Sequence, residues 1–267
     1  MTKNILKYSI LKVVLLSTLF ILFQCQKAKD SHESFINKLN LPFQEYSVKD
    51  SIQIELDEIY TLLAYSFVLK DWQSDSTPRE NRRGYNIGTV LINANNDVVN
   101  WALNCVNSTN STQHGEVRAI TSFLEKTGNY NLSNYTLYTT LEPCAMCAGM
   151  MIMTSVNRVV YGQHDVEFSQ AMNRLALNSK GVGGYDPYPR TVISDPSPSF
   201  YRKALDSAYA NFLKSEDEKY LAKFLTTDKA WALYERANSD FMNYKTKFPE
   251  NREKYERAKA FYLIQSP

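Results

Sequence analysis

The chain has 267 residues, 44% of them apolar and 13% aromatic, which is enough for one domain with a substantial core plus an appendage. Its formal net charge of +2 is close to neutral and argues against a strongly electropositive nucleic-acid-binding surface. Four cysteines are too few, and wrongly spaced, for a disulfide-stabilised scaffold.

The first 25 residues have the composition of a targeting segment. Lys3, Lys7 and Lys12 form a basic front, residues 13–23 are an apolar run of the length found in secretory signals, and Cys25 follows at once. The apolar run is too short to span a bilayer comfortably as a helix. Residues 1–25 are therefore expected to be a signal rather than part of the fold.

Residues 22–25, Leu-Phe-Gln-Cys, resemble the cleavage box of bacterial lipoproteins and predict lipidation of Cys25. A cleaved soluble signal and an uncleaved anchor are the alternatives. Loss of residues 1–25 leaves 27 basic and 28 acidic residues, so the remaining chain is near neutral. We expect an exported protein of the bacterial cell envelope, with residues 26–50 as a tether and the lipid as its contact with the membrane.

The folded domain is expected to span residues 51–214. Apolar residues at helical spacing predict an amphipathic helix over residues 52–69, capped by Asp50 or Ser51. Residues 71–85 are predicted to be a solvated polar linker that carries several arginines.

A β-hairpin is predicted next. Residues 87–92 and 98–103 have the pattern of strands, and the turn-forming residues 93–97 separate them. A loop rich in Asn, Ser and Thr follows over residues 104–113.

Thr112 is predicted to cap a helix that ends near Gly128, which places His114 and Glu116 in its first turn. The β-branched and aromatic residues 135–140 predict another strand.

Pro143 comes after Glu142 and is favoured at the first position of a new helix. Cys144 and Cys147 then lie three residues apart on one face of that helix. Two helix N-termini are thus expected to meet at the end of a sheet, where α/β proteins commonly bind ligands.

Residues 197–213 are predicted to form a closing helix, and residues 215–267 an α-helical extension in which Pro249 separates the last two helices. Its inward-facing aromatic residues are expected to be Trp231, Tyr234, Phe241, Tyr255 and Tyr262. The extension could cap a pocket, widen a dimer contact or bind a partner, but packing against the core is the favoured interpretation.

Two motifs, His114-x-Glu116 and Pro143-Cys144-x-x-Cys147, together form the signature of zinc-dependent deaminases. One imidazole and two thiolates hold Zn²⁺ and leave the fourth tetrahedral position to water. A carboxylate beside the metal can take a proton from that water and pass it to a ring nitrogen and a departing amine. Glu116 is close enough in sequence to His114 for this role.

Each motif also has a simpler interpretation. A histidine at a loop-to-helix junction is often only solvated, and Cys-x-x-Cys can be a redox pair or half of a zinc ribbon. A ribbon needs a second Cys pair, which the sequence lacks. A redox pair explains neither the His114-x-Glu116 motif nor Pro143. His164 is expected to be structural or pocket-lining rather than a metal ligand.

Residues 139–149 and 158–162 resemble the cytidine and deoxycytidylate deaminase superfamily, nearest to its tRNA-adenosine, guanine and fungal cytosine deaminase branch. The resemblance covers roughly residues 56–213. It implies an α/β, three-layer fold with a mixed five-stranded sheet flanked by helices, whose last two strands are residues 158–161 and 191–194.

The resemblance also implies roles for individual residues. The expected zinc site consists of His114, Cys144 and Cys147, with Glu116 as the proton shuttle. For substrate binding, the resemblance implies that Asn104 hydrogen-bonds the base.

Gly115 and Glu142 are the other expected substrate-binding residues. Gly115 stands where most members have alanine, and its backbone N–H can donate to a base carbonyl. Residues 163–190 are expected to form one wall of the pocket.

The resulting hypothesis is a zinc-dependent hydrolytic deaminase of a nucleobase or nucleoside of the cytosine, guanine or adenosine type. Attack of zinc-bound hydroxide would release ammonia. The near-neutral charge and the export-like start disfavour a nucleic-acid substrate. The alternatives are a tRNA or other nucleic-acid adenosine or cytidine deaminase, and a non-catalytic zinc-binding lipoprotein domain. A homodimer is expected.

Overall fold

The computed structural model describes residues 47–48, 50–215 and 219–266. The predicted signal with Cys25, and most of the predicted tether, lie outside these residues. Within the described ranges, no helix has both the length and the apolar character needed to cross a membrane.

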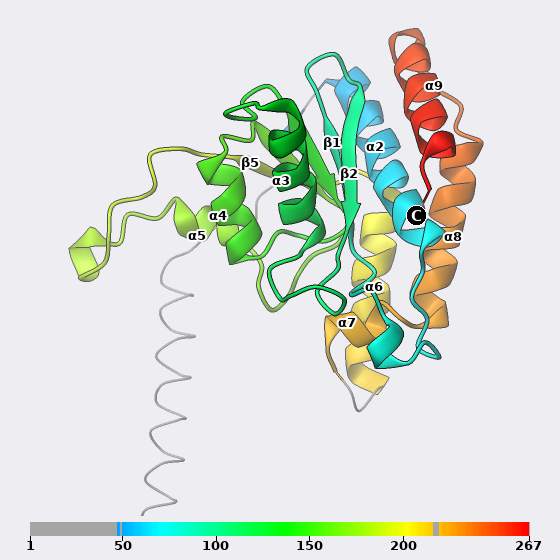
Figure 1. The fold of residues 1–267 in the computed structure, drawn as a ribbon, viewed down its shortest axis with the longest axis horizontal. Helices are drawn as coiled ribbons and strands as arrows, with labels where there is room; N and C mark the ends of the chain where they lie inside the picture. Colours follow the sequence, from blue (N-terminus) through cyan, green and yellow to red (C-terminus); the bar gives the residue numbers. More distant parts are fainter. Residues whose placement is uncertain (1–46, 49, 216–218, 267) are drawn as a thin grey trace, which may run out of the picture. The chain divides into compact units, whose positions relative to one another are not determined.

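A mixed five-stranded sheet forms the centre of the domain, in the order β2-β1-β3-β4-β5 (Figure 1). The strands are β1 Gly88–Ile92, β2 Val98–Leu103, β3 Thr136–Thr139, β4 Arg158–Tyr161 and β5 Ile193–Pro196. β1 is antiparallel to both β2 and β3, whereas β3, β4 and β5 are parallel. The predicted hairpin and the predicted mixed sheet are therefore confirmed.

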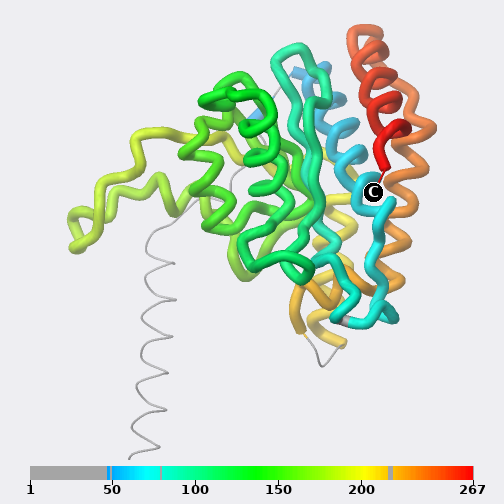
Figure 2. The backbone as a smooth tube through the Cα atoms, viewed as in Figure 1, coloured from blue at the N-terminus to red at the C-terminus, as the bar shows by residue number. Residues whose placement is uncertain are grey.

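Helices cover both faces of the sheet (Figures 1 and 2). On one side lie α3 Gly115–Thr127, α4 Ala145–Met153 and α5 Ala171–Leu175; on the other lie α2 Ser51–Lys70, α6 Phe200–Ser215, α8 Asp228–Met242 and α9 Pro249–Ile264. Successive side chains of each strand point to opposite faces of the sheet and contribute to two hydrophobic cores. Val90 and Tyr138 pack on the α2 side, and Leu91 and Leu137 pack on the α3 side. The short elements are α7 Leu221–Phe224, η1 Arg79–Asn81 and η2 Lys180–Val182.

α2 begins after Asp50, whose side chain accepts a hydrogen bond from the Ile52 N–H at 3.1 Å. The predicted cap is thus confirmed, but the predicted amphipathic character is wrong. Residues on all sides of α2 are buried, including Tyr60 and Phe67. The reason is that α8 and α9 cover the face that the sheet leaves open.

The C-terminal extension packs on the domain, as favoured from the sequence. Tyr234, Phe241, Tyr255 and Tyr262 are buried, whereas Trp231 is 39% exposed, so its predicted inward position is wrong. Pro249 opens α9 as its first residue.

Several predicted element boundaries shift. Pro143 does not open a helix, because Cys144 is the N-cap of α4 and the helix begins at Ala145. His114, not Thr112, is the N-cap of α3. The last strand and α6 each begin two or three residues later than predicted, at Ile193 and Phe200.

Candidate active site

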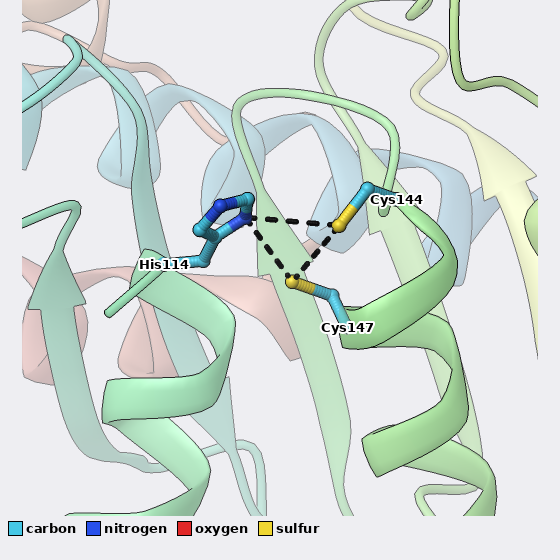
Figure 3. A group of neighbouring side chains, drawn as sticks. All are labelled: His114, Cys144 and Cys147. Atoms are coloured by element: carbon cyan, nitrogen blue, oxygen red, sulfur yellow. Dashed lines mark hydrogen bonds between the residues drawn. The ribbon is translucent and has the colours of Figure 1, made fainter. Parts of the chain in front are cut away.

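His114, Cys144 and Cys147 converge at one edge of the sheet (Figure 3). His114 Nδ1 lies 3.7 Å from Cys144 Sγ and 3.5 Å from Cys147 Sγ, and the two sulfur atoms are 3.7 Å apart. Cys147 is fully buried, and the other two are partly exposed. The sequence-predicted trio is therefore brought together in space.

The topology of the sheet explains this convergence. β2 and β3 run in the same direction because each is antiparallel to β1, so their C-terminal ends meet at one edge. α3 follows β2, and α4 follows β3. His114 caps the first helix and Cys144 caps the second, so both N-termini face the same point.

The donor set fits zinc. Tetrahedral Zn²⁺, with Zn–S of about 2.3 Å and Zn–N of about 2.0–2.1 Å, separates its ligand atoms by about 3.5–3.8 Å. The three observed distances of 3.5 to 3.7 Å match this spacing. Three protein ligands leave one tetrahedral position open, which is the arrangement of catalytic sites.

The two thiols differ in their acidity. Hydrogen bonding with Cys147, and also with His114, lowers the pKa of the Cys144 thiol to about 4. Hydrogen bonding with Cys144, and burial, raise the pKa of the Cys147 thiol. The site thus already favours one thiolate, and a bound cation would favour ionisation of the second.

Glu116 lies in the first turn of α3 and is only 3% exposed. Its Oε1 accepts a hydrogen bond of 3.3 Å from the Thr139 hydroxyl, and its buried Oε2 has no hydrogen-bond partner among the described residues. Burial raises the pKa of this carboxyl group above its ordinary value, against an opposing effect of His114. A carboxyl group with one uncommitted oxygen beside a metal site can accept and return a proton.

A cavity of about 230 Å³ opens beside these groups. Its floor includes His114, Glu116 and Cys144. The other lining residues, from four separate segments, are Tyr85, Ile87, Leu141, Glu142, Asp165, Glu167, Phe168, Tyr220, Leu221, Ala222 and Leu225. Among the described residues that line it, none is Lys or Arg.

Glu142 lies in the cavity wall with both carboxylate oxygens engaged. Oε1 accepts from the Gln170 N–H at 2.6 Å, and Oε2 lies 2.6 Å from His164 Nδ1 and 3.3 Å from the Asp165 nitrogen. Glu142 therefore orders the loop that carries Asp165 into the cavity. His164 pairs with Glu142 and is not among the residues that line the cavity. Substrate binding by Glu142 stays a prediction.

Asn104 is fully buried and does not line the cavity. Its Oδ1 accepts hydrogen bonds from the backbone N–H groups of Tyr85 and Val106, at 3.1 and 3.2 Å. Gly115 also lies outside the lining, packed under Thr89, whose Oγ1 would be 3.1 Å from an added Cβ. The predicted contacts of both residues with a base stay predictions.

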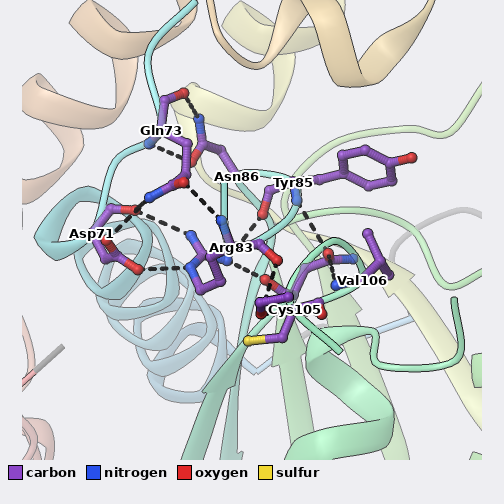
Figure 4. A network of polar contacts seen from close by, with 9 residues as sticks. Asp71, Gln73, Arg83, Tyr85, Asn86, Cys105 and Val106 are labelled. Carbon is purple, nitrogen blue, oxygen red and sulfur yellow. Dashed lines mark hydrogen bonds and ion pairs between the residues drawn. The ribbon is translucent and has the colours of Figure 1, made fainter. Parts of the chain in front are cut away.

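A polar network fixes the segment before β1 (Figure 4). Arg83 Nε donates to Asp71 Oδ2 at 2.7 Å, and its Nη1 donates to the Asn104 carbonyl oxygen. The Arg83 N–H donates to Gln73 Oε1 at 2.9 Å. The arginine is 14% exposed, so the predicted solvated linker is wrong here: these contacts hold Arg83 in place.

The prediction that residues 163–190 form one wall of the pocket is only partly right. Asp165, Glu167 and Phe168 line the cavity, but residues 181–189 do not. This stretch projects away from the sheet next to α5 (Figure 1). Tyr220, Leu221, Ala222 and Leu225 also line the cavity, although no helical period or motif in the sequence marks them as pocket-lining.

Residues 69–163 match a family model described as the cytidine and deoxycytidylate deaminase zinc-binding region. The chain is 38% identical over 142 residues to a tRNA-specific adenosine deaminase of Haemophilus influenzae, a match that covers 52% of this chain and 78% of that relative. It is 31% identical over 112 residues to a probable cytosine deaminase of Schizosaccharomyces pombe, covering 40% of this chain and 68% of the relative.

A solved structure from work on A-to-I editing by tRNA:A34 deaminases aligns with 28% identity and a TM-score of 0.32, over 41% of this chain and 78% of that one. His114, Cys144 and Cys147 lie inside the matched residues 69–163, whereas Tyr220 to Leu225 lie outside them.

Proposed function

Because this chain belongs to the cytidine and deoxycytidylate deaminase family, we propose that it is a zinc-dependent hydrolytic deaminase of a nucleobase or nucleoside. One observation carries the proposal. His114 and Cys144, which belong to the zinc-spaced trio completed by the buried Cys147, line the same small cavity as the buried carboxyl group of Glu116.

The reaction replaces an exocyclic amine on a ring carbon by a carbonyl, with uptake of water and release of ammonia. Zinc, when bound by the trio, supplies a water whose pKa falls to roughly 7. Glu116 Oε2 takes one proton from the water and delivers it to the ring nitrogen. It then takes the second proton from the hydroxyl group added to the ring carbon and passes it to the departing amine, which leaves as ammonia. Burial of Glu116 suits both directions of transfer, since a raised pKa brings the carboxyl group closer to neutral pH.

The size and lining of the cavity favour a small substrate. Its volume of about 230 Å³ is modest, and Leu141, Phe168 and Leu221 provide apolar surface for a flat ring. Because Glu116, Glu142, Asp165 and Glu167 line it without Lys or Arg among the described residues, the wall disfavours a phosphate group.

The first test replaces Glu116 with Gln in the full-length protein. Loss of the proton shuttle should lower kcat for ammonia release by about 10²–10⁴-fold. Zinc content, measured by elemental analysis, should not change, and Glu125→Gln near the exposed end of α3 serves as the control. Cytosine, guanine, adenine and their nucleosides are assayed with and without a chelator. Activity that survives Glu116→Gln would contradict the mechanism.

A tRNA adenosine deaminase is the second candidate, favoured by the 38% identity with the Haemophilus influenzae enzyme. It predicts conversion of adenosine in a tRNA anticodon stem-loop and a steep fall of activity with salt. A base or nucleoside deaminase predicts turnover of the small substrates and little dependence on salt.

The non-catalytic alternative is a zinc-binding domain without turnover. It predicts zinc retention and no ammonia release from any of these substrates.

A further inference from the structure

Beyond the proposed function, the structure carries information on substrate size. A second cavity, of about 260 Å³, lies next to the first and is lined by Arg82, Gly84, Tyr85, Asn107, Tyr220, Ala222, Lys223 and Thr226. Tyr85, Tyr220 and Ala222 line both cavities. We call these three residues the partition.

We propose that the partition is the size filter of the active site: it admits a free nucleobase beside the zinc trio and excludes the sugar of a nucleoside. The inference rests on the proposed function and narrows it to free bases. The first cavity alone, at about 230 Å³, lies below the range of roughly 300–1,000 Å³ typical of ligand pockets. A ligand with an added ribose would need the space beyond the partition.

The partition is firmly held at its inner end. The Asn86 Nδ2 donates to the Leu225 carbonyl at 2.8 Å. It also donates to the Gln73 carbonyl at 2.7 Å, and the Asn86 Oδ1 accepts from the Gln73 N–H at 2.9 Å (Figure 4). Asn86 is 1% exposed and stands directly between Tyr85 and Ile87, which both line the first cavity. One buried amide thus joins the two chain segments that form the partition.

The outer end is held by charge and by aromatic packing. Lys223 Nζ lies 2.7 and 2.8 Å from the two carboxylate oxygens of Asp75, and the Asp75 N–H donates to the Thr226 carbonyl at 3.2 Å. Phe224 is 1% exposed and packs against the rings of Tyr209 and Phe212. α7 is therefore a fixed wall.

Tyr220 is the residue through which the filter can be tested. Tyr220 and Tyr85 are the two large side chains of the partition. Tyr220 is 48% exposed, so its truncation removes little buried surface. Tyr220 is the N-cap of α7 without a side-chain capping bond, so its replacement costs no cap interaction. Tyr220→Ala should join the two cavities while leaving Asn86, Asp75 and Phe224 in place.

The experiment compares bases with their nucleosides: cytosine with cytidine, guanine with guanosine, and adenine with adenosine. The full-length zinc-loaded protein, Tyr220→Ala, the size-conserving Tyr220→Phe and the exposed neighbour Lys219→Ala are assayed for ammonia release. Dissociation constants are measured in parallel in the Glu116→Gln background, where the ligand is not consumed. Circular dichroism melting verifies that each variant is folded.

The unmodified protein should prefer one base over its nucleoside, and Tyr220→Ala should reduce that preference by about tenfold or more, in kcat/KM and in Kd. Tyr220→Phe and Lys219→Ala should keep it. Equal use of base and nucleoside by the unmodified protein, or an unchanged ratio in folded Tyr220→Ala, overturns the size filter while the deaminase stands. Size-selective binding without turnover by zinc-loaded protein overturns the deaminase alone, and failure of every base and every nucleoside to bind overturns both.

Discussion

Cys144 and Cys105 illustrate how much position decides the role of a thiol. Both are free cysteines, but Cys105 is 8% exposed, lies two residues after the end of β2 and is outside the metal-spaced trio. Cys144 caps α4, and its thiol is 3.7 Å from both His114 Nδ1 and Cys147 Sγ.

Cys144→Ser should therefore reduce zinc from about one ion per chain to a small fraction, because a hydroxyl group is a poor ligand for this site. Cys105→Ser should keep the zinc. Elemental analysis of the two folded variants measures the difference, and a chelator should lower the Tm of the Cys105→Ser protein but not that of Cys144→Ser, since only a metal-binding protein gains stability from the metal. Equal zinc content in both variants would contradict the ligand assignment.

His164 is the residue through which pH should affect stability. Its hydrogen bond with Glu142 raises its pKa above the ordinary 6.5, against the opposing effect of burial, and Asp206 adds to the rise while Arg202 opposes it. A raised pKa in the folded state means a stabilising contribution that is complete below pH 6.5 and is lost as the pH rises through the folded-state value.

His164→Gln should consequently destabilise the protein more at pH 5.5 than at pH 8.5. The free energy of unfolding in urea, measured across this range for the protein and the variant, gives the difference as a function of pH. A difference that grows with increasing pH would contradict the assigned pairing with Glu142.

At the scale of helices and strands, a single carboxylate connects α2 with α9. Glu55 in α2 is 3% exposed, and its oxygens accept hydrogen bonds from the Lys247 N–H, from the Phe248 N–H at 3.2 Å and from Asn251 Nδ2 at 2.8 Å. These groups lie at the start of α9, where a negative charge is favourable.

Glu55→Ala leaves these donors without their acceptor and should cost about 1–3 kcal/mol in the free energy of unfolding. Glu253→Ala, whose side chain is 83% exposed and pairs with Arg257, should cost less than about 1 kcal/mol. Urea denaturation of the two variants tests this. A loss in Glu55→Ala no larger than in Glu253→Ala would show that the contact does not stabilise α9.

The same elements show what the sequence could predict. Strand patterns, the Asp50 cap and the Cys-x-x-Cys spacing are local signals, and they predict the first three strands, the start of α2 and the cysteine pair. The last two strands and the mixed sheet are implied instead by the resemblance to the deaminase family. The burial of the outer face of α2 depends on helices more than 150 residues later, and no local period encodes such a contact. The wall formed by Tyr220 to Leu225 was likewise not predictable, because long-range hydrogen bonds such as that of Asn86 position it.

At the scale of the whole molecule, the open question is where in the cell the protein is located. We propose that the chain is exported and lipidated at Cys25. Labelled palmitate should be incorporated into the full-length protein in a bacterial host and should be absent from Cys25→Ala, with Cys105→Ser as the labelled control. Equal labelling of Cys25→Ala, or none in any version, would exclude lipidation at this position.

The position of α2 between the sheet and the last two helices has a consequence for biosynthesis. α2 leaves the ribosome before α8 and α9, which shield its outer side, have been made. Until α8 and α9 are made, the outer hydrophobic face of α2 is exposed to solvent, and exposed hydrophobic surface of this kind is typically bound by chaperones. Folding should therefore be post-translational, which would keep the chain in a form that a secretion channel can thread.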